Sequence, residues 1–566
     1  MSIARVALCQ MNCRVGDISG NVSKVKRQTE KALAAGADVI CFPELTVCGY
    51  PPEDLLLKPG FTDKNLKGLE QIVKSAYPLT IVAGFVERRG TKKSPVLYNS
   101  AAVISGGKIA GIHRKNLLPN YGVFDENRYF APGDKAPLFQ SGGFAMGVSI
   151  CEDIWFEGGP VLEQARGGAD LIINISASPY SIGKPAAREK MLRARAKKAG
   201  TALAFCNMTG GQDELVFDGH SAFFDKKGAV TVRGAGFRED MIFADFEVPV
   251  RGRKRRAGYK IKSPVVKKVA AVLPQITPFA AQNDEIFSAL VLGTRDYVEK
   301  NGFETVVIGL SGGIDSALVA AVAVEALGPE RVVAVNMPSI FSSKSGIKDS
   351  QTLAANLGVG FRSVPIDGIV SSYEKHAPEP FKLRVGEKSS TALENIQARA
   401  RGNILMAFSN RFGWLVLTTG NKSEVSVGYS TLYGDTAGGF AVIKDVKKTL
   451  VYELSRHYNK KRGFDAVPKT VIEKPPSAEL KPNQLDSDSL PPYDVLDEIL
   501  KHYVENDKSV AEVISLSGAS ARAVRKIVDL VDRNEYKRRQ TPPGVKLTDK
   551  AFGKDRRMPI TNFYRN

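Results

Sequence analysis

The chain has 566 residues, of which 43% are hydrophobic and 25% are charged. This length exceeds that of one ordinary domain, and the composition is typical of a globular protein with two to four domains. The formal net charge of +19 favours anionic ligands such as nucleotides, phosphates or nucleic acid.

Three further features narrow the class of protein. The apolar runs are far shorter than the roughly 18–20 residues that a membrane span needs. The first residues enter a strand pattern directly and lack the layout of a signal peptide. The six cysteines are scattered and form no C-x-x-C pair, so neither a disulfide framework nor a zinc site is indicated. We therefore expect a cytoplasmic protein that does not associate with membranes.

The first 250 residues alternate between β-branched runs and helical patterns. A helix is expected over residues 21–35, and strands are expected over 3–9, 38–42, 79–86, 100–104, 145–150, 171–175 and 202–207. This order predicts sheets whose outer faces are covered by helices, an α/β layered domain over residues 1–250.

A basic segment follows, and residues 251–282 are the best candidate for a linker. The run 251–256 contains five Arg or Lys residues, and Pro264, Pro274 and Pro278 interrupt any periodicity. A nucleic-acid-binding patch is the alternative interpretation of this charge. No aromatic stacking set or known reader motif accompanies it, so a solvated linker is favoured.

Residues 283–566 form the second predicted domain. A helical pattern opens at Asp284 and leads to a strand at 305–310, a helix at 316–327 and a strand at 332–336. This order is typical of a doubly wound parallel sheet. Residues 473–493 are rich in Pro, Ser and Asp and are expected to be extended or mobile. Helix then returns after Asp494, before a basic, turn-rich tail.

Three residues in the first domain stand where a predicted strand gives way to a turn. They are Glu44, Lys115 and Cys151. Ligands of α/β sheets gather at the carboxyl ends of strands, so these side chains could meet there as a base, a cationic stabiliser and a nucleophile. Each alone has an ordinary interpretation, as a turn residue, a surface lysine and a core cysteine.

The surrounding phrases, Phe-Pro-Glu-Leu at 42–45, His-Arg-Lys-Asn at 113–116 and Cys-Glu-Asp-Ile-Trp at 151–155, resemble the nitrilase superfamily. The resemblance covers residues 1–250 and implies an αββα sandwich. It implies that Cys151 is the nucleophile, Glu44 the general base and Lys115 the stabiliser of the oxyanion. A nearby ammonium and a carboxylate base would make the thiolate accessible. In the branch that uses glutamine, the resemblance implies substrate-binding or supporting roles for Tyr121, Ser178, Lys184 and Glu126.

The second domain carries Ser-Gly-Gly-Ile-Asp-Ser at 311–316, directly between a strand and a helix. Gly312 and Gly313 permit a backbone nest, and the helix N-terminus adds donors for phosphate. No Gly-Lys-Ser/Thr follows, so this is not a Walker loop. The phrase resembles the pyrophosphate loop of the N-type ATP pyrophosphatases, which implies ATP as substrate and a magnesium ion near Asp315.

Later phrases, at 394–399, 418–424, 428–435 and 473–480, are similar to those of the NAD synthetases, in the branch that uses glutamine. This resemblance implies three sets of site residues. The ATP-binding set is Gly309, Leu310, Ser311, Gly312, Gly313, Ile314, Asp315, Ser316 and Thr419. The set for deamido-NAD (nicotinic acid adenine dinucleotide) is Asn395, Arg399, Glu424 and Lys537, with Asp435 as a further candidate. The metal set is Asp315 and Glu424. For Arg399 and Asp435, a helix-face ion pair and a turn residue remain the alternatives.

The resemblance implies a carbon–nitrogen ligase with glutamine as nitrogen donor. Glutamine would yield ammonia, and ATP would convert the carboxylate of deamido-NAD to an acyl adenylate. Ammonia passed internally would then give NAD, AMP, diphosphate and glutamate. A homo-oligomer, at least a dimer, is expected. Three alternatives remain: another acceptor acid, an ammonia-only synthetase with a vestigial first domain, and a nucleic-acid-binding protein acting through residues 251–268.

Overall fold

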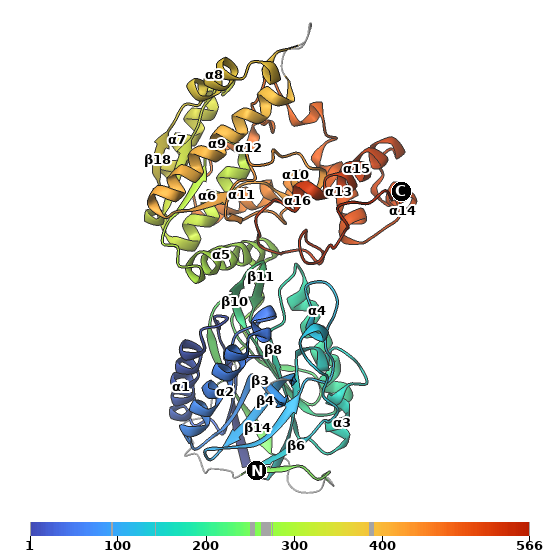
Figure 1. The fold of residues 1–566 in the computed structure, drawn as a ribbon. Helices are drawn as coiled ribbons and strands as arrows, with labels where there is room; N and C mark the ends of the chain where they lie inside the picture. The colour runs from blue at the N-terminus through green and yellow to red at the C-terminus, as the bar shows by residue number, and fades with distance from the viewer. Residues whose placement is uncertain are drawn as a thin grey trace. The chain divides into compact units, whose positions relative to one another are not determined.

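The computed structural model describes residues 2–91, 94–141, 143–248, 255–261, 273, 275–383 and 390–564. The chain divides into two compact units, Met1–Glu285 and Ile286–Asn566 (Figure 1). The boundary falls in the first turn of helix α5 (Gln282–Lys300). Half of the predicted linker 251–282 lies outside the described residues.

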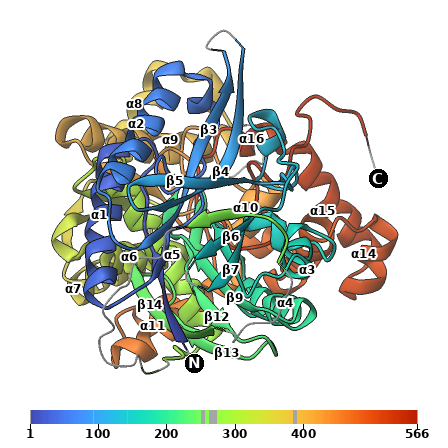
Figure 2. The same ribbon diagram turned by 90° about the horizontal axis from the view of Figure 1, so that it is seen from below.

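Unit 1 contains two large sheets. The first has the order β14 (Asp240–Val248), β1 (Ser2–Gln10), β2 (Val39–Cys41), β3 (Thr80–Gly90), β4 (Pro95–Ser105) and β5 (Lys108–Arg114). The second has the order β13 (Val230–Arg233), β12 (Ala222–Phe224), β9 (Ala202–Asn207), β8 (Leu171–Ser176), β7 (Phe144–Ile150), β6 (Leu138–Ser141) and β15 (Tyr259–Ile261). β10 (Thr209–Gln212) and β11 (Leu215–Asp218) form a separate hairpin. The far ends of β3 and β4 project beyond the sheet (Figure 2).

Three hydrophobic clusters show how the layers of unit 1 stack. One cluster joins the two sheets, with Val6 of β1 and Val148 of β7 among its members. A second fills the space between the first sheet and helices α1 (Ile18–Ala34) and α2 (Pro59–Lys74). The third lies between the second sheet and helices α3 (Pro160–Arg166) and α4 (Lys184–Ala199). The layers are therefore αββα, with the helix pairs on opposite sides (Figure 1), as the sequence predicted.

Two arginines of the basic segment are described, and both bind carboxylates of unit 1. The Arg255 guanidinium lies 2.8 Å from Asp170, and that of Arg256 lies 2.6 Å from Glu163. These two ion pairs hold this part of the basic segment against unit 1.

Unit 2 is built on a five-stranded parallel sheet with the order β18 (Gly360–Ser363), β17 (Val332–Asn336), β16 (Val306–Gly309), β19 (Leu415–Thr418) and β20 (Phe440–Ala441). The chain runs outward from β16 to β18 and then returns to β19 on the other side of β16. This reversal is the topological switch point of a doubly wound fold, where ligands usually bind.

Helices cover the sheet of unit 2. They are α6 (Ile314–Leu327), α7 (Lys344–Leu357), α8 (Asp367–His376), α9 (Thr391–Phe412), α10 (Lys422–Val427), α11 (Lys448–Arg462) and α12 (Lys469–Glu473). α6 is buried along nearly its whole length, which explains its continuous apolar sequence. A further hydrophobic cluster joins α10 to α13 (Tyr493–Leu500), α14 (Val510–Ser517) and α15 (Ala521–Arg533), and α16 (Glu535–Arg538) follows.

The segment 473–493 forms no strand and is mostly irregular, with turns and a short 3-10 helix at Asp486–Asp488, whereas its composition predicted an extended or mobile segment. Internal bonds hold it, since the amide of Leu480 donates to the Gln484 side chain at 2.8 Å. Across the described part of the chain, no helix has both the length and the apolar character required to cross a membrane.

Candidate functional site

Unit 1 brings Glu44, Lys115 and Cys151 together from three strand ends. Glu44 follows β2, Lys115 follows β5, and Cys151 follows β7. The Lys115 Nζ lies 2.7 Å from the Glu44 Oε1, and both side chains are fully buried. Cys151 is 4% exposed and is close enough to interact electrostatically with both. Residues more than 100 positions apart thus form one cluster.

The backbone has positive φ angles at two turns that orient the side chains of the cluster. Cys151 has φ 41° and Leu45, next to Glu44, has φ 46°. Such values are uncommon for residues other than glycine. Gly84 of β3 lets the Glu44 turn approach, since a Cβ there would lie 2.2 Å from the Leu45 amide nitrogen.

A second carboxylate, Glu126, lies beside the lysine. The Lys115 Nζ is 2.7 Å from the Glu126 Oε1, and the Tyr50 hydroxyl donates to the same oxygen at 3.0 Å. Asn99 links the two acids by donating to Glu44 at 2.7 Å and to Glu126 at 3.4 Å. Burial raises the pKa of Glu126 to about 7, which Lys115 opposes and Glu44 reinforces. One ammonium is therefore shared between two buried acids.

Burial and the neighbouring charges act on the Cys151 thiol in opposite directions. Burial raises the pKa of Cys151 well above its ordinary value, Glu44 adds to the rise, and Lys115 opposes it. The thiolate that the sequence predicts therefore depends on transfer of the thiol proton to a base, since burial favours the neutral form.

Asp153 connects the cysteine turn to the lysine segment. Its Oδ1 accepts from the backbone amides of Asn116 at 2.9 Å and Leu117 at 3.0 Å. Its Oδ2 accepts from the amide of Ile150 at 3.0 Å and lies 2.9 Å from the His113 Nε2. One buried carboxylate therefore fixes the chain just before Cys151 against the chain just after Lys115.

A more open group of polar side chains flanks the cysteine. The Tyr121 hydroxyl donates to Glu152 at 3.0 Å, and Lys184 interacts electrostatically with Glu152. Lys184 begins α4, and its Nζ lies 5.9 Å from the centre of the Trp155 ring. The amide of Ser178 donates to Asn207 at 2.9 Å, and that of its neighbour Ala177 donates to Glu44 at 2.9 Å. These predicted glutamine contacts thus border the cluster.

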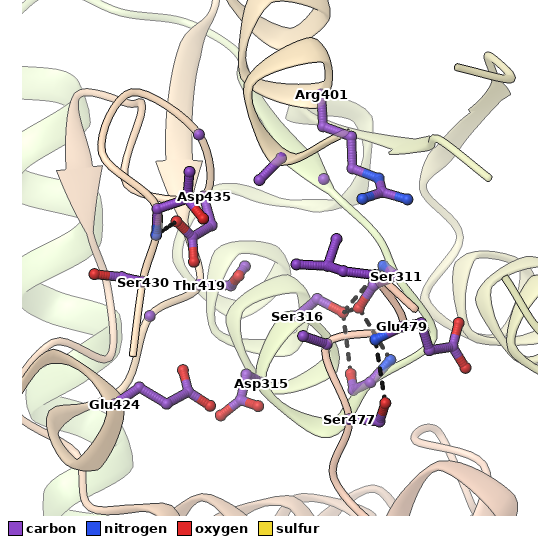
Figure 3. Close-up of a pocket in the computed structure, with 18 of the residues that line it drawn as sticks. Ser311, Asp315, Ser316, Arg401, Thr419, Glu424, Ser430, Asp435, Ser477 and Glu479 are labelled. Atoms are coloured by element: carbon purple, nitrogen blue, oxygen red, sulfur yellow. Dashed lines mark hydrogen bonds between the residues drawn. The ribbon is translucent and has the colours of Figure 1, made fainter. Parts of the chain in front are cut away.

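Unit 2 contains a cavity of about 470 Å³ at the switch point of its sheet. The lining includes these predicted ATP-binding residues: Gly309, Leu310, Ser311, Gly313, Ile314, Asp315, Ser316 and Thr419. α6 begins here with Gly313 as its N-cap and without a side-chain cap, so its first amides are available to a ligand. Ser311 and Ser316 hold the loop, with their hydroxyl oxygens 3.2 Å apart (Figure 3).

Gly312 is the one loop residue outside the lining. It has φ 81°, and a Cβ there would lie 2.3 Å from the carbonyl oxygen of Gly346. Glycine is needed at this position so that the loop can pack against α7.

A lysine bridges two acids on the β19 side of the cavity. Lys448, from the start of α11, forms an ion pair with Asp315, and its Nζ lies 3.2 Å from the Glu424 Oε1. The Asn421 side chain donates to Asp315 at 2.8 Å. Burial raises the pKa of Glu424 to about 8, Lys448 opposes this, and Asp315 adds to it. Figure 3 shows the carboxylates of Asp315 and Glu424 facing each other.

The other predicted dinucleotide residues divide into two groups. Asn395, Asp435 and Lys537 line the cavity, and burial raises the pKa of Asp435 to about 6. Lys537 donates to the carbonyls of Gly428 and Ser430, at 2.8 and 2.9 Å. Arg399 is absent from the lining, because its Nε turns away to donate to the carbonyl of Leu432 at 3.2 Å.

The acids present fit one magnesium ion that accompanies a nucleotide. Within the described ranges, no group of three or more His, Cys, Asp or Glu side chains is arranged to hold a metal. Asp315 and Glu424 supply two carboxylates, and magnesium commonly takes one or two from a protein and the rest from phosphates and water.

Sequence reasoning missed several residues of these two sites. Glu152 had a usable signal, because it adjoins Cys151 in a motif already recognised. Tyr50, Asn99 and Lys448 had none, since their contacts arise only when distant segments meet.

Comparisons with known proteins agree with this division of the chain. A family of carbon–nitrogen hydrolases matches residues 5–256, and the NAD synthase family matches residues 286–541. The glutamine-dependent NAD(+) synthetase of Thermotoga maritima is 47% identical over 100% of both chains. That of Aquifex aeolicus is 44% identical over 98% of this chain and 99% of the relative. A solved structure of the enzyme from Acinetobacter baumannii, in complex with ADP, is 41% identical, with a TM-score of 0.75 over 99% of this chain and 98% of its own. The chain therefore belongs to the glutamine-dependent NAD(+) synthetase family.

Proposed function

We propose that this protein makes NAD from deamido-NAD, ATP and glutamine. The observation that carries the proposal is the presence of two complementary sites in one chain. Unit 1 holds a buried thiol beside a carboxylate and an ammonium. Unit 2 holds a cavity at an uncapped helix N-terminus, which suits phosphate.

In unit 1, the Sγ of Cys151 attacks the side-chain carboxamide of glutamine, and Glu44 accepts the thiol proton. Burial favours the neutral thiol, so transfer of its proton to Glu44 would accompany attack. The carbonyl oxygen becomes an oxyanion that Lys115 stabilises. Collapse breaks the C–N bond, and Glu44 returns the proton to the departing ammonia. Water then hydrolyses the thioester to give glutamate.

Glutamine would be selected by its α-amino and α-carboxylate groups. Glu152 offers a carboxylate to the α-ammonium, and its partner Tyr121 adds a hydroxyl. Lys184 offers a cation to the α-carboxylate. Ser178 would contribute from the segment whose preceding residue, Ala177, donates from its amide to Glu44. Burial raises the pKa of Glu152, and an ammonium ligand would favour its charged form.

In unit 2, the loop Gly309–Ser316 and Thr419 would bind ATP, with the phosphates at the first amides of α6. The carboxylate of deamido-NAD attacks the α-phosphorus and expels diphosphate, forming the acyl adenylate. Ammonia then attacks the acyl carbon and releases AMP. Asn395, Asp435 and Lys537 would bind deamido-NAD, and Arg399 would support this region through Leu432.

Asp315 and Glu424 would hold magnesium, which would neutralise the charge of the ATP phosphates. Lys448 forms ion pairs with both acids and lines the same cavity, so it would supply a further cation to the phosphates.

Internal passage of ammonia is part of the proposal, because free ammonia is mostly ammonium at neutral pH. Labelled external ammonium that enters NAD freely during glutamine turnover would contradict it. Assembly as a cytoplasmic homo-oligomer, at least a dimer, is proposed on the family resemblance.

The full chain, given deamido-NAD, ATP, magnesium and glutamine, should form NAD, AMP, diphosphate and glutamate in equal amounts. Cys151→Ala should abolish the reaction with glutamine and retain it with ammonium chloride. Cys206→Ala, a change at another buried strand-end cysteine of unit 1, should retain both. Failure of the wild-type chain to convert deamido-NAD with ammonium would refute the proposal.

A further inference from the structure

One face of α9 forms a wall of the cavity in unit 2. Asn395, Ala398 and Arg401, spaced three residues apart, all line it. Arg399 precedes Arg401 by two positions and so points about 200° away around the helix. Figure 3 shows the guanidinium of Arg401 extending from α9 toward the part of the cavity near Ser311 and Glu479.

Arg401 has no carboxylate partner at ion-pair distance within the part of the chain that the structure describes. Its only protein hydrogen bond there runs from Nε to the carbonyl of Met337, at 3.0 Å. The two nearest acids are engaged elsewhere. Glu479 is 2.7 Å from the Lys474 Nζ, and Asp367 accepts from the amide of Ile340 at 2.9 Å.

This isolation is costly for a cation. Burial lowers the pKa of Arg401 to about 10, and Glu479 and Asp367 only partly oppose the shift. Arg401 is partly buried, and a single hydrogen bond to a carbonyl replaces only part of the hydration that its guanidinium loses. A ligand that meets its open face would recover part of that cost.

The surroundings of Arg401 indicate which part of a nucleotide it meets. A nucleotide with its phosphates at α6 can extend along the sheet edge toward β19 or toward β17. The β19 side holds the charged group Asp315, Glu424 and Lys448. The β17 side is lined by the apolar side chains of Met337, Ile347 and Leu405. Apolar walls and one planar cation suit a purine ring.

We propose that Arg401 binds the nucleoside part of ATP by laying its guanidinium plane against the purine base. The inference rests on the proposed function, because it takes ATP as the nucleotide in this cavity. The Nε bond to the carbonyl of Met337 fixes the orientation of the plane, and the remaining N–H groups stay available to the ligand.

The test compares Arg401→Gln, Arg401→Lys and Arg411→Gln in the full chain. Arg411 is an exposed residue in the last turn of α9 and serves as the control. Isothermal titration measures binding of ADP and of inorganic triphosphate, which has no base. Both Arg401 variants should bind ADP about tenfold more weakly than wild type, because glutamine loses the charge and lysine loses the plane. Arg411→Gln should bind ADP as wild type does, and all variants should bind triphosphate with the wild-type affinity.

Steady-state kinetics with ammonium as nitrogen donor provides a second readout. The KM for ATP should rise in both Arg401 variants, while the KM for deamido-NAD stays within twofold of wild type. Circular dichroism and thermal unfolding check that each variant is folded. If Arg401→Gln does not fold, Arg401→Lys alone provides the test.

Three outcomes would overturn the assignment. Wild-type ADP affinity in Arg401→Lys would show that charge alone matters. Weaker triphosphate binding in the Arg401 variants would place the contact on the phosphates. A rise only in the KM for deamido-NAD would place Arg401 in the other substrate's site. If wild type itself bound no ADP, the proposed function would fail as well, and that result is distinct from these three.

Discussion

Replacing Lys115 with Met removes the ammonium that holds two buried acids together. The Lys115 Nζ lies 2.7 Å from both the Glu44 Oε1 and the Glu126 Oε1, and none of these side chains is more than 6% exposed. Met fills a similar volume without charge. The substitution therefore leaves two carboxylates facing each other without a counter-ion.

The expected loss of stability is about 3–5 kcal/mol, which is typical when one partner of a buried ion pair is removed. For a domain of this size, about 2 °C per kcal/mol gives a fall of about 6–10 °C in the midpoint of unit 1. The loss should be larger at pH 8 than at pH 5. Lys115 opposes the raised pKa of Glu126, so removing it raises that pKa further. An acid with a raised pKa in the folded state loses stability as the pH rises through that pKa.

Scanning calorimetry of the full chain at both pH values measures the effect. Lys422→Met is the matched control in unit 2, because Lys422 is fully buried, with its Nζ 2.8 Å from Asp445 and 2.8 Å from Glu505. Each variant should lower the transition of its own unit. Lys115→Met/Glu126→Gln should recover part of the loss, since only one carboxylate remains. An unchanged midpoint in Lys115→Met, or an equal loss at both pH values without recovery in the double variant, would refute the reasoning.

Three further changes test other features. Asp153→Asn should lower the turnover of glutamine to glutamate about 100-fold, because small displacements of reacting groups cost about that much. Asp170→Asn is the control, because it also removes a charged acceptor beside β7. It should lower thermal stability without the loss of about 100-fold in glutamine turnover. An equal loss of turnover in both variants would contradict a positioning role for Asp153. Gly84→Ala should abolish most of the glutaminase activity, because the added Cβ would displace the backbone at Leu45. Synthesis of NAD with ammonium should persist. Release of glutamate at the wild-type rate would contradict this prediction. Wild type should lose stability as the pH rises from about 5 to about 8, because the pKa of Glu424 of about 8 means that the folded state holds a proton that the unfolded state releases. Glu424→Gln should remove this loss from the pH profile of the free energy of unfolding. Identical profiles for variant and wild type would count against this reasoning.

Much of the fold follows from local patterns in the sequence. The strand before Ser311 and the helix after it are set by a continuous apolar run and by two glycines, and both form as predicted. The helix-covered sheets of unit 1 likewise follow from short apolar strands that alternate with helical patterns, whereas the αββα order was implied by the resemblance to the nitrilase superfamily. Such features depend on neighbours in the chain, so a sequence carries them directly.

The site is less predictable, because its geometry depends on contacts between distant segments. Asn99 lies just before the predicted strand 100–104, and only the formation of the longer β4 and its pairing with neighbouring strands bring it to Glu44. Lys448 and Asp315 are 133 positions apart in the chain, and only the folded sheet brings them together. Arg399 and Arg401 are identical residues two positions apart in the sequence. Only the orientation of α9 about its axis decides which of them faces the cavity.

All six cysteines belong to unit 1, and unit 2 contains none. Five of them are at most 1% exposed, while Cys151 is 4% exposed beside a polar opening. Pulsed alkylation followed by mass spectrometry would therefore report the opening of unit 1 alone. Modification of Cys151 before the other five would record substrate-sized access, and simultaneous modification of all six would record global unfolding of that unit. Because unit 2 contains no cysteine, its unfolding would leave the alkylation pattern unchanged, and the measurement isolates the behaviour of unit 1.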